Sequence, residues 1–479
     1  VGHTGDVWSI ALDGDRLVSG SSDQTIRVWD LSQLKRRMHP QLNIFVSKDN
    51  EWIAWTPEGF YNASKGAEQY IGYHINQGAN REARFLDVKR FRKQFYRPDL
   101  IAKAVRGEDI GSYAQGIDID AILADEGLPP RVEIMTDSHS INGESTEIGV
   151  KICEESGGVE NLNFYVDGKP IRYLSKTKAF REQKKRVGNC SVIVQQISVP
   201  SGKHTIGFNA TNAKGNILSN TPTIIIMNNK KVIRKPNLHL LTLSINDYKD
   251  DSLDLKFPNN DADVLSQKFK KIGKSIFGKV ETYALKDSQV TKEQIEKKVK
   301  EIASNIGVND VFVLYISGHG ITHEKDGDYY FIPYGCANGA DVQKHAINQD
   351  IFKKIMSEIK AVKSVIMLDT CQSGSMASEE LLSTSVNRFG GNVGSAIIAG
   401  ASSRQDAIDG YKNHGIFTYT VLDAMDNPKV YDFQDRLSIG DIAKYVKYLL
   451  PKLAKENFGY EQKPTIYMNG DVSFALGGR

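Results

Sequence analysis

Two patterns of hydrophobic and polar positions divide the chain. Up to about residue 230, short stretches alternate apolar and polar residues between turn residues, a pattern that predicts antiparallel strands. From Pro236 onward, continuous apolar runs alternate with stretches whose apolar residues recur every three to four positions. Buried parallel strands give the first of these patterns, and amphipathic helices give the second. Residues 236–479 are therefore predicted to form an α/β domain, a mainly parallel sheet with helices on both faces.

The elements of this α/β domain can be placed from their patterns. One helix begins after Thr291, which starts a capping box with Gln294. The other predicted helices are 261–272, 349–359, one around 417–424, and 438–450. The predicted strands are Leu238–Ile245, Lys279–Leu285, Val311–Ile316, Ser364–Leu368 and Ser395–Ala401.

The residues before this domain divide into three segments. Residues 129–230 hold short alternating strands, with Asp167-Gly168 as a hairpin turn signal. Such strands over about 100 residues are typical of an immunoglobulin-like β-sandwich. Residues 38–128 are interpreted as a connector, because they are rich in aromatic and turn residues that would pack domains together. Residues 1–37 alternate in short stretches separated by turns, as in a small β-element.

This first segment resembles one WD repeat, a single blade of a β-propeller, in its frame from Gly2-His3 to Trp29-Asp30. The resemblance implies that His3, Ser19, Asp23 and Trp29 form that family's internal hydrogen-bond network. One blade cannot bury both of its faces. We therefore expect the last blade of a propeller whose upstream part is missing, so that the chain is a fragment or processed form.

The composition excludes several classes of protein. The 479 residues are too many for one core, so two to four domains are expected. A net charge of +3, with only short basic stretches, argues against nucleic-acid binding. Four cysteines show no metal-binding spacing and are too few for a disulfide scaffold, which favours a cytoplasmic location. No apolar run reaches about 18 residues, so we expect no membrane-spanning helix.

The candidate chemistry lies in two short strings, each directly after a predicted buried strand. Ser317-Gly318-His319-Gly320 follows the strand Val311–Ile316, and Asp369-Thr370-Cys371-Gln372 follows Ser364–Leu368. Open α/β sheets place their chemistry beyond the carboxyl ends of the strands. A cysteine needs a base or a positive partner to become a thiolate at neutral pH, and His319 can be either. The pair indicates a cysteine protease.

Residues 236–470 resemble the caspase-like fold, in particular metacaspases and bacterial orthocaspases. His319 precedes Cys371 by about 50 residues, as in caspases. Two departures stand out: Gln372 occupies a position where metacaspases usually carry histidine, and the chain lacks the Q-A-C-x-G string of animal caspases. The resemblance rests on Leu243–Tyr248, Pro258–Ala262, Tyr315–Gly320, Leu368–Gly374 and Gly415–Tyr419.

The resemblance implies a role for each of these residues. His319 and Cys371 would be the catalytic dyad, and the backbone N–H groups of Gly320 and Cys371 the oxyanion hole. Asp261 and Asp369 would bind an Arg or Lys side chain before the cut bond. Asp261 has an alternative as a helix N-cap, because it precedes an amphipathic stretch. Ser402 and Asp406 are further substrate-binding candidates, with an ordinary turn as the alternative, and His414 and His323 are interpreted as loop histidines.

Two further expectations concern processing and metals. The segment 376–394 is polar and without periodicity, and it lies where caspase-like proteins separate their two subunits. Arg388 within it is a candidate self-cleavage site. No cofactor is expected, although metacaspases often need calcium and Asp326, Asp328 and Asp350 could contribute ligands. Their spacing is not that of an EF-hand.

The sequence thus predicts an endopeptidase that cuts protein substrates after Arg or Lys. A regulatory protein partner would act through the N-terminal modules, in a bacterial defence or cell-death role. The alternative is a catalytically silent caspase-like scaffold that acts in protein–protein interaction.

Overall fold

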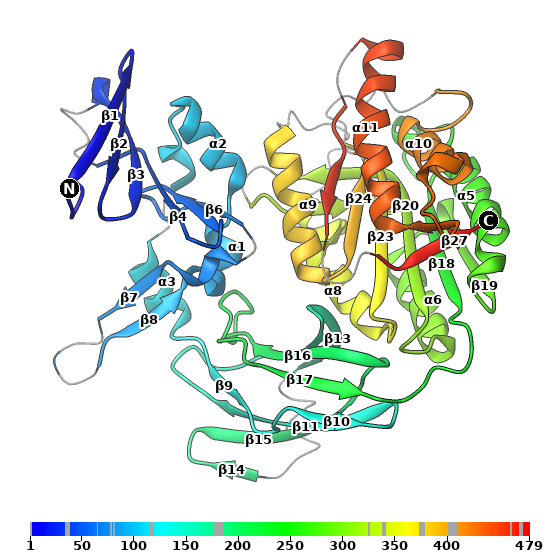
Figure 1. The fold of residues 1–479 in the computed structure, drawn as a ribbon, viewed down its shortest axis with the longest axis horizontal. Coiled ribbons are helices and arrows are strands. Elements are labelled where there is room, and N and C mark those ends of the chain that lie inside the picture. The colour runs from blue at the N-terminus through cyan, green and yellow to red at the C-terminus, as the bar shows by residue number, and fades with distance from the viewer. Residues whose placement is uncertain are drawn as a thin grey trace.

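A computed structural model of the chain shows an N-terminal sheet, a two-sheet β-module and a C-terminal α/β domain (Figure 1). The residues it describes are 2–33, 39–64, 66–76, 79, 82–114, 118–175, 185–323, 326–337, 342–372, 379–400, 410–459, 462–468 and 473–479. Within these ranges, no helix is both long enough and apolar enough to span a membrane.

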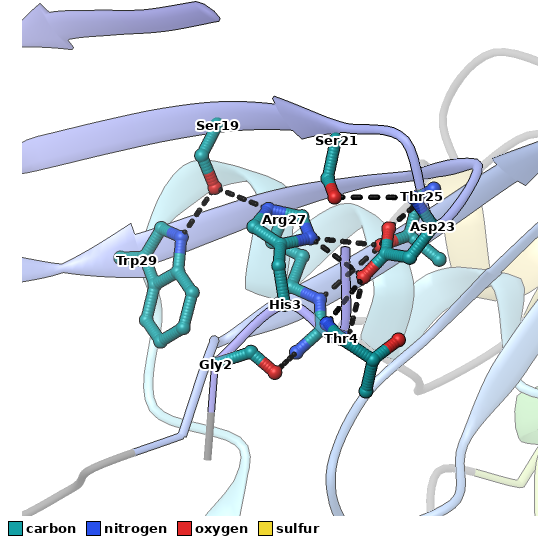
Figure 2. A network of polar contacts seen from close by, with 9 residues as sticks. All are labelled: Gly2, His3, Thr4, Ser19, Ser21, Asp23, Thr25, Arg27 and Trp29. Atoms are coloured by element: carbon teal, nitrogen blue, oxygen red, sulfur yellow. Dashed lines mark hydrogen bonds and ion pairs between the residues drawn. The ribbon is translucent and has the colours of Figure 1, made fainter. Parts of the chain in front are cut away.

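The N-terminal sheet has six antiparallel strands, in the order in which they follow one another along the chain. The sheet includes strands on both sides of residue 37, which was the expected end of the first segment. The predicted network is confirmed: the His3 ring bonds to Asp23 and Ser19, and the Trp29 indole N–H donates to Ser19 (Figure 2). The strands are β1 Val7–Asp13, β2 Arg16–Ser21, β3 Thr25–Asp30, β4 Leu42–Val46, β5 Trp52–Trp55 and β6 Tyr61–Ala63.

The residues predicted to be a connector have a buried apolar cluster of their own. Phe60, Phe91 and Phe95 are central to it, so the aromatic residues do pack together. The segment contains a hairpin of β7 (Gly72–Ile75) and β8 (Arg84–Asp87), and three short helices. These helices are α1 Arg92–Phe95, α2 Pro98–Arg106 and α3 Ile119–Glu126.

The following module consists of two sheets that share one apolar core. One sheet has the order β14-β15-β11-β9, and the other has the order β10-β17-β16-β12-β13. The immunoglobulin-like assignment stays a prediction. The strands are β9 Arg131–Ile134, β10 His139–Ile141, β11 Ser145–Cys153, β12 Asn161–Val166, β13 Lys169–Ser175, β14 Lys185–Val187, β15 Cys190–Ser198, β16 Gly202–Ala210 and β17 Thr223–Asn228.

This module contains a disulfide, which the low cysteine count did not lead us to expect. Cys153 and Cys190 are directly opposite each other on the antiparallel pair β11 and β15, and their sulfurs are bonded. Cross-strand neighbours bring two cysteines close enough to bridge even when the chain has few of them. The low cysteine count was therefore a poor guide to disulfide bonding.

The C-terminal domain has a central mixed sheet in the order β19-β18-β20-β23-β24-β26. Neighbouring strands are parallel except for the last, β26, which is antiparallel to β24. The predicted strands and the mainly parallel pairing are confirmed. They are β18 Leu238–Ser244, β19 Val280–Lys286, β20 Val311–Thr322, β23 Lys363–Gln372, β24 Ala396–Ala399 and β26 Thr465–Tyr467, and a short β21 (Tyr329–Phe331) pairs with the end of β20.

Helices cover both faces of this sheet, as the pattern predicted. Helices α6, α8 and α9 share one buried cluster with one face, and α5, α10 and α11 share a second cluster with the other. Thr291 caps α6 and Ser438 caps α11, both as expected. The bounds are α5 Pro258–Ile272, α6 Lys292–Asn305, α8 Gln349–Glu358, α9 Glu379–Val393, α10 Ile416–Asp426 and α11 Ile439–Phe458.

The β-module is joined to the α/β domain by a buried lysine. Lys169, at the start of β13, donates to the carbonyl oxygens of Ile359 (2.7 Å) and Ala361 (2.6 Å) in the turn between α8 and β23. Burial lowers the pKa of Lys169 to about 7. Both bonds connect regions almost 200 residues apart along the chain, so they fix the module against the domain.

Candidate active site

Strand pairing brings the two candidate catalytic residues together. β20 and β23 are adjacent and parallel, and their register pairs Ser317 with Asp369 and His319 with Cys371. The two strings of the sequence therefore end side by side at the carboxyl edge of one sheet, as expected from their position after two buried strands. The strand register alone is sufficient to place the histidine and the cysteine on neighbouring strands.

The His319 ring is held by a main-chain carbonyl. Its Nε2 lies 2.8 Å from the carbonyl oxygen of Leu253, and the residue is 0% exposed. A carbonyl oxygen only accepts hydrogen bonds, so Nε2 must carry the proton. In the neutral ring Nδ1 is then the nitrogen that carries no proton. An unprotonated nitrogen is the feature a general base requires.

Tyr248 and Gly318 hold the main chain next to His319. The backbone N–H of His319 donates to the Tyr248 hydroxyl at 2.8 Å. Gly318 has a φ of 155°, and a Cβ at this position would lie 2.7 Å from that hydroxyl oxygen. Only glycine leaves room for the tyrosine at this distance. The small residue before the histidine is thus explained by the contact that positions the histidine.

Several sequence candidates fall partly or wholly outside the described residues. The backbone of Cys371 is described as part of β23, but its side chain is not. Ser402 and Asp406 lie in the segment 401–409, which is outside the described residues. Their roles, and that of Gly320 in an oxyanion hole, stay predictions.

Asp369 lies in a buried polar cluster next to the candidate dyad. The Thr418 hydroxyl, on α10, donates to its carboxylate, and the Tyr315 hydroxyl donates to the same oxygen at 3.4 Å. Burial, and then the charge of nearby Asp261, raise the pKa of Asp369 to about 7. A positively charged neighbour would stabilise the ionised form of this carboxyl group.

Asp261 lies close to Asp369, although it comes from a different element. A Cβ built on Gly415 would be 2.9 Å from an Asp369 oxygen and 3.2 Å from an Asp261 oxygen, so both carboxyls face the same glycine. Asp261 is 1% exposed and accepts the backbone N–H of Gly415 at 2.8 Å. We call Asp261 and Asp369 the acidic pair. The N-cap alternative for Asp261 is wrong, because α5 begins at Pro258 with Phe257 at the cap.

His414 lies in the loop before α10, as expected, but it has a contact that the sequence interpretation did not foresee. Its Nδ1 lies 2.5 Å from Asp261 Oδ1, so it is bonded to the acidic pair. The contact joins positions 153 residues apart. The available signal was its place directly before Gly415–Tyr419, a string already associated with the site.

Arg388 is not in an irregular segment, which corrects another expectation. It lies in helix α9, is 4% exposed and pairs with Asp328 at 3.0 Å. The same guanidinium nitrogen, Nη2, also donates to the carbonyl oxygen of Lys93, in α1, at 2.7 Å. A protease binds extended, accessible chain, so cleavage after Arg388 would require α9 to unfold first.

The carboxylates considered for calcium already have other partners. Asp328 pairs with Arg388, and Asp326 accepts hydrogen bonds from Tyr330 and Gln343. Among the described residues, no group of three or more His, Cys, Asp or Glu side chains could hold a metal ion. These side chains therefore do not fit a calcium site.

Comparison with known proteins finds family matches for two parts of the chain. A family model described as Caspase domain matches residues 239–472, and one described as WD domain, G-beta repeat matches residues 1–30. The WD repeat-containing protein pop1 of Schizosaccharomyces pombe (strain 972 / ATCC 24843) is 62% identical over 29 residues, which are 6% of this chain and 4% of that protein.

Similar solved structures cover about half of the chain. The protein GSU0716 from Geobacter sulfurreducens is 15% identical, with a TM-score of 0.34, over 49% of this chain and 94% of that one. Caspase-1 from Spodoptera frugiperda is 12% identical, with a TM-score of 0.33, over 51% of this chain and 92% of that one.

Proposed function

Taking as premise that residues 239–472 belong to the caspase domain family of cysteine peptidases, we propose that this chain is an endopeptidase that cuts protein substrates after Arg or Lys. His319 and Cys371 would be its dyad. The observation that carries the proposal is the register of β20 and β23, which pairs these two residues. The described His319 ring, with its proton on Nε2, is in the form required of the base.

The reaction begins at the unprotonated Nδ1 of His319. The ring takes the proton of the Cys371 thiol, and the thiolate attacks the carbonyl carbon of the substrate. The protonated ring then gives that proton to the leaving amine. A water molecule, deprotonated by the same ring, releases the acyl group and restores the thiol. By family resemblance, the N–H groups of Gly320 and Cys371 would stabilise the negative oxygen formed in each step.

The acidic pair supports the preference for a basic residue. Two carboxyl groups face one glycine at the edge where the substrate would bind, and the pKa of Asp369 is raised to about 7. A guanidinium or ammonium group placed between them would favour the ionised form of both. An aspartate side chain would instead be repelled, which argues against the specificity of animal caspases.

Control by the N-terminal modules is supported by contacts on α9, the next described element after β23. The backbone N–H of Asp99, in α2, donates to the Thr384 hydroxyl at 3.1 Å. Arg388 links the same helix to the carbonyl of Lys93 and to Asp328, near the end of β20. A partner that moved the connector would therefore act on both sides of the candidate dyad.

The test is hydrolysis of fluorogenic peptides that differ only in having Arg, Lys or Asp before the reporter. We expect the Arg and Lys peptides to be cut, and Cys371→Ala to lose this activity by at least about 10³-fold. Cys336→Ala is the matched control, because that thiol is buried and outside the disulfide. Equal activity in Cys371→Ala would contradict the proposed dyad, and the absence of any cleavage by the wild-type chain would favour a scaffold that only binds proteins.

A further inference from the structure

Basic residues gather at the amino end of the central sheet. Residues 229–237 join the β-module to β18, and residues 269–280 run from the last turn of α5 to the start of β19 (Figure 1). The Lys235 ammonium donates to the carbonyl oxygen of Ser275 at 2.8 Å, so the fold brings these two segments into contact. Neither segment contains Asp or Glu. Their eight basic residues are Lys230, Lys231, Arg234, Lys235, Lys270, Lys271, Lys274 and Lys279.

Five of these basic residues are available to an outside partner. The other three, Lys230, Arg234 and Lys279, form ion pairs with acidic side chains of the chain itself. Within the described part of the chain, the remaining five have no ion pair, and all five are exposed. We call them the basic patch: Lys231, Lys235, Lys270, Lys271 and Lys274.

Two large apolar side chains lie next to the basic patch and extend into water. Ile233 is 99% exposed and Phe433 is 93% exposed, the highest values among the large hydrophobic residues of the described chain. Ile233 belongs to the segment that bonds to Ser275. Phe433 reaches the same place from another loop: a Cβ at Gly478 would lie 2.7 Å from Ser275 Oγ and 3.2 Å from the carbonyl oxygen of Asp435. Single exposed apolar residues are ordinary, but two beside one unpaired basic cluster indicate an interaction surface.

We propose that the basic patch, together with Ile233 and Phe433, binds the surface of an anionic lipid bilayer. The lysine ammonium groups would contact the phosphate and carboxylate headgroups, and the two apolar side chains would enter the boundary between headgroups and acyl chains. Such a site lies on the membrane and needs no spanning helix. A nucleic acid fits less well, because Ile233 has no ring on which a base could stack. The site does not use the candidate dyad, so this inference is independent of the proposed function.

The place of the basic patch in the fold determines how a bound chain would be oriented. The patch lies at the start of β18, whereas the candidate dyad lies at the opposite end of β20, which runs parallel to β18. β18 is seven residues long, which separates the two ends by roughly 23 Å at about 3.3 Å per residue. Residues 246–263, beyond the far end of β18, contain six Asp and two Lys, so an anionic surface would repel this end. A bound chain would therefore present its candidate active site to the water.

The test is co-sedimentation of the full chain with lipid vesicles. One set contains phosphatidylcholine alone, and the other contains equal amounts of phosphatidylcholine and phosphatidylserine. We expect binding only to the second set, and we expect it to weaken as salt is added, because salt screens the headgroup charges. Lys231→Gln with Lys271→Gln and Lys274→Gln should weaken binding by roughly 100-fold, at about fivefold for each lysine. Ile233→Ser leaves the charge unchanged and should weaken binding by roughly tenfold, because it removes apolar area that the bilayer would bury.

The matched control removes the same amount of charge outside the basic patch. Lys444, Lys447 and Lys455 are exposed lysines of helix α11. Changing all three to glutamine should leave vesicle binding unchanged, because the proposed contact depends on where the charges lie and not on the net charge. Thermal unfolding of each variant without vesicles shows that the fold is intact.

Several results would overturn the lipid site. Equal binding to both sets of vesicles, or no binding to either, would do so, as would a loss in the α11 control as large as in the patch variant. Unchanged binding in Ile233→Ser would show that the apolar side chain does not enter the bilayer. Binding of the wild-type chain to RNA but not to anionic vesicles would assign the patch to nucleic acid instead. None of these measurements involves peptide hydrolysis, so each leaves the proposed function as it stands.

Discussion

The candidate dyad and the acidic pair lie at the same edge of one sheet, but they are assembled differently. His319 and Cys371 are on neighbouring strands, and their meeting follows from one strand register. Asp261 and Asp369 come from α5 and β23, and the loop before α10 completes the arrangement through His414 and Gly415. The first arrangement is as rigid as the sheet. The second depends on how three separate elements pack, so it is the part that substitutions and pH should change gradually.

The largest expected effect is on the dyad. His319→Ala should lower kcat for an Arg peptide by at least about 10³-fold, because it removes the base that would take the thiol proton. KM should change little, since the ring is not part of the acidic pair. The rate at which a thiol-alkylating reagent modifies Cys371 provides the check. His319→Ala should be alkylated more slowly at Cys371 than the wild-type chain. Unchanged alkylation would show that His319 does not activate the thiol.

A smaller effect is expected at the acidic pair. Asp369→Asn should raise KM for an Arg peptide by roughly 10- to 100-fold, the effect of one charge-assisted hydrogen bond of about 1.5–3 kcal/mol. The side chain keeps its size and can still accept from Thr418. Steady-state kinetics with Arg peptides measures the change. An equal loss of kcat alone would mean that Asp369 aligns the dyad instead of binding substrate.

The pH dependence separates these two roles. The pKa of Asp369 is raised to about 7, so the carboxyl ionises as pH rises through neutrality, and KM for the Arg peptide should fall from pH 6 to pH 8. The free energy of unfolding should, in contrast, be lower at the higher pH. The folded chain holds a proton that the unfolded chain has lost above about pH 4, so stability decreases from about pH 4 to 7. Asp369→Asn should flatten both profiles, as denaturant titrations and kinetics would show.

The smallest effect is expected at His414. Its ring now occupies an oxygen of Asp261 that an incoming guanidinium would use. His414→Ala should therefore lower KM for Arg peptides by roughly 2- to 10-fold, the net value of one hydrogen bond. His323→Ala is the matched control, since His323 pairs with Asp326 away from the acidic pair. A higher KM in His414→Ala would mean that the ring orients Asp261 for substrate.

The sequence was sufficient for features that depend on neighbouring residues in the chain. Apolar runs and caps located the strands and helices of the caspase domain, and the strings after two strands located His319 and Cys371. The contact of His414 with Asp261 was missed because it joins two segments far apart in the sequence, and the position of His414 before Gly415–Tyr419 does not reveal its partner.

Helix α9 was missed for a different reason. It contains Gly390 and Gly391, which normally disfavour a helix. A Cβ at Gly390 would lie 2.2 Å from the ring of Tyr467, on β26, so the glycine allows the helix to approach the sheet closely. Tertiary packing thus overrides a local preference. The burial of Arg388 follows from the same helix, and it could not be inferred from residues 376–394 alone.

Lys169 could serve as a built-in chemical reporter of domain docking. Its amine is buried between two carbonyl oxygens, and its pKa is lowered to about 7. While the β-module is docked, an acylating reagent cannot reach this amine. When the module is undocked, the lysine becomes an accessible amine and is acylated by the reagent. A mass shift on one peptide would then measure the fraction of molecules in which the β-module is no longer docked on the α/β domain.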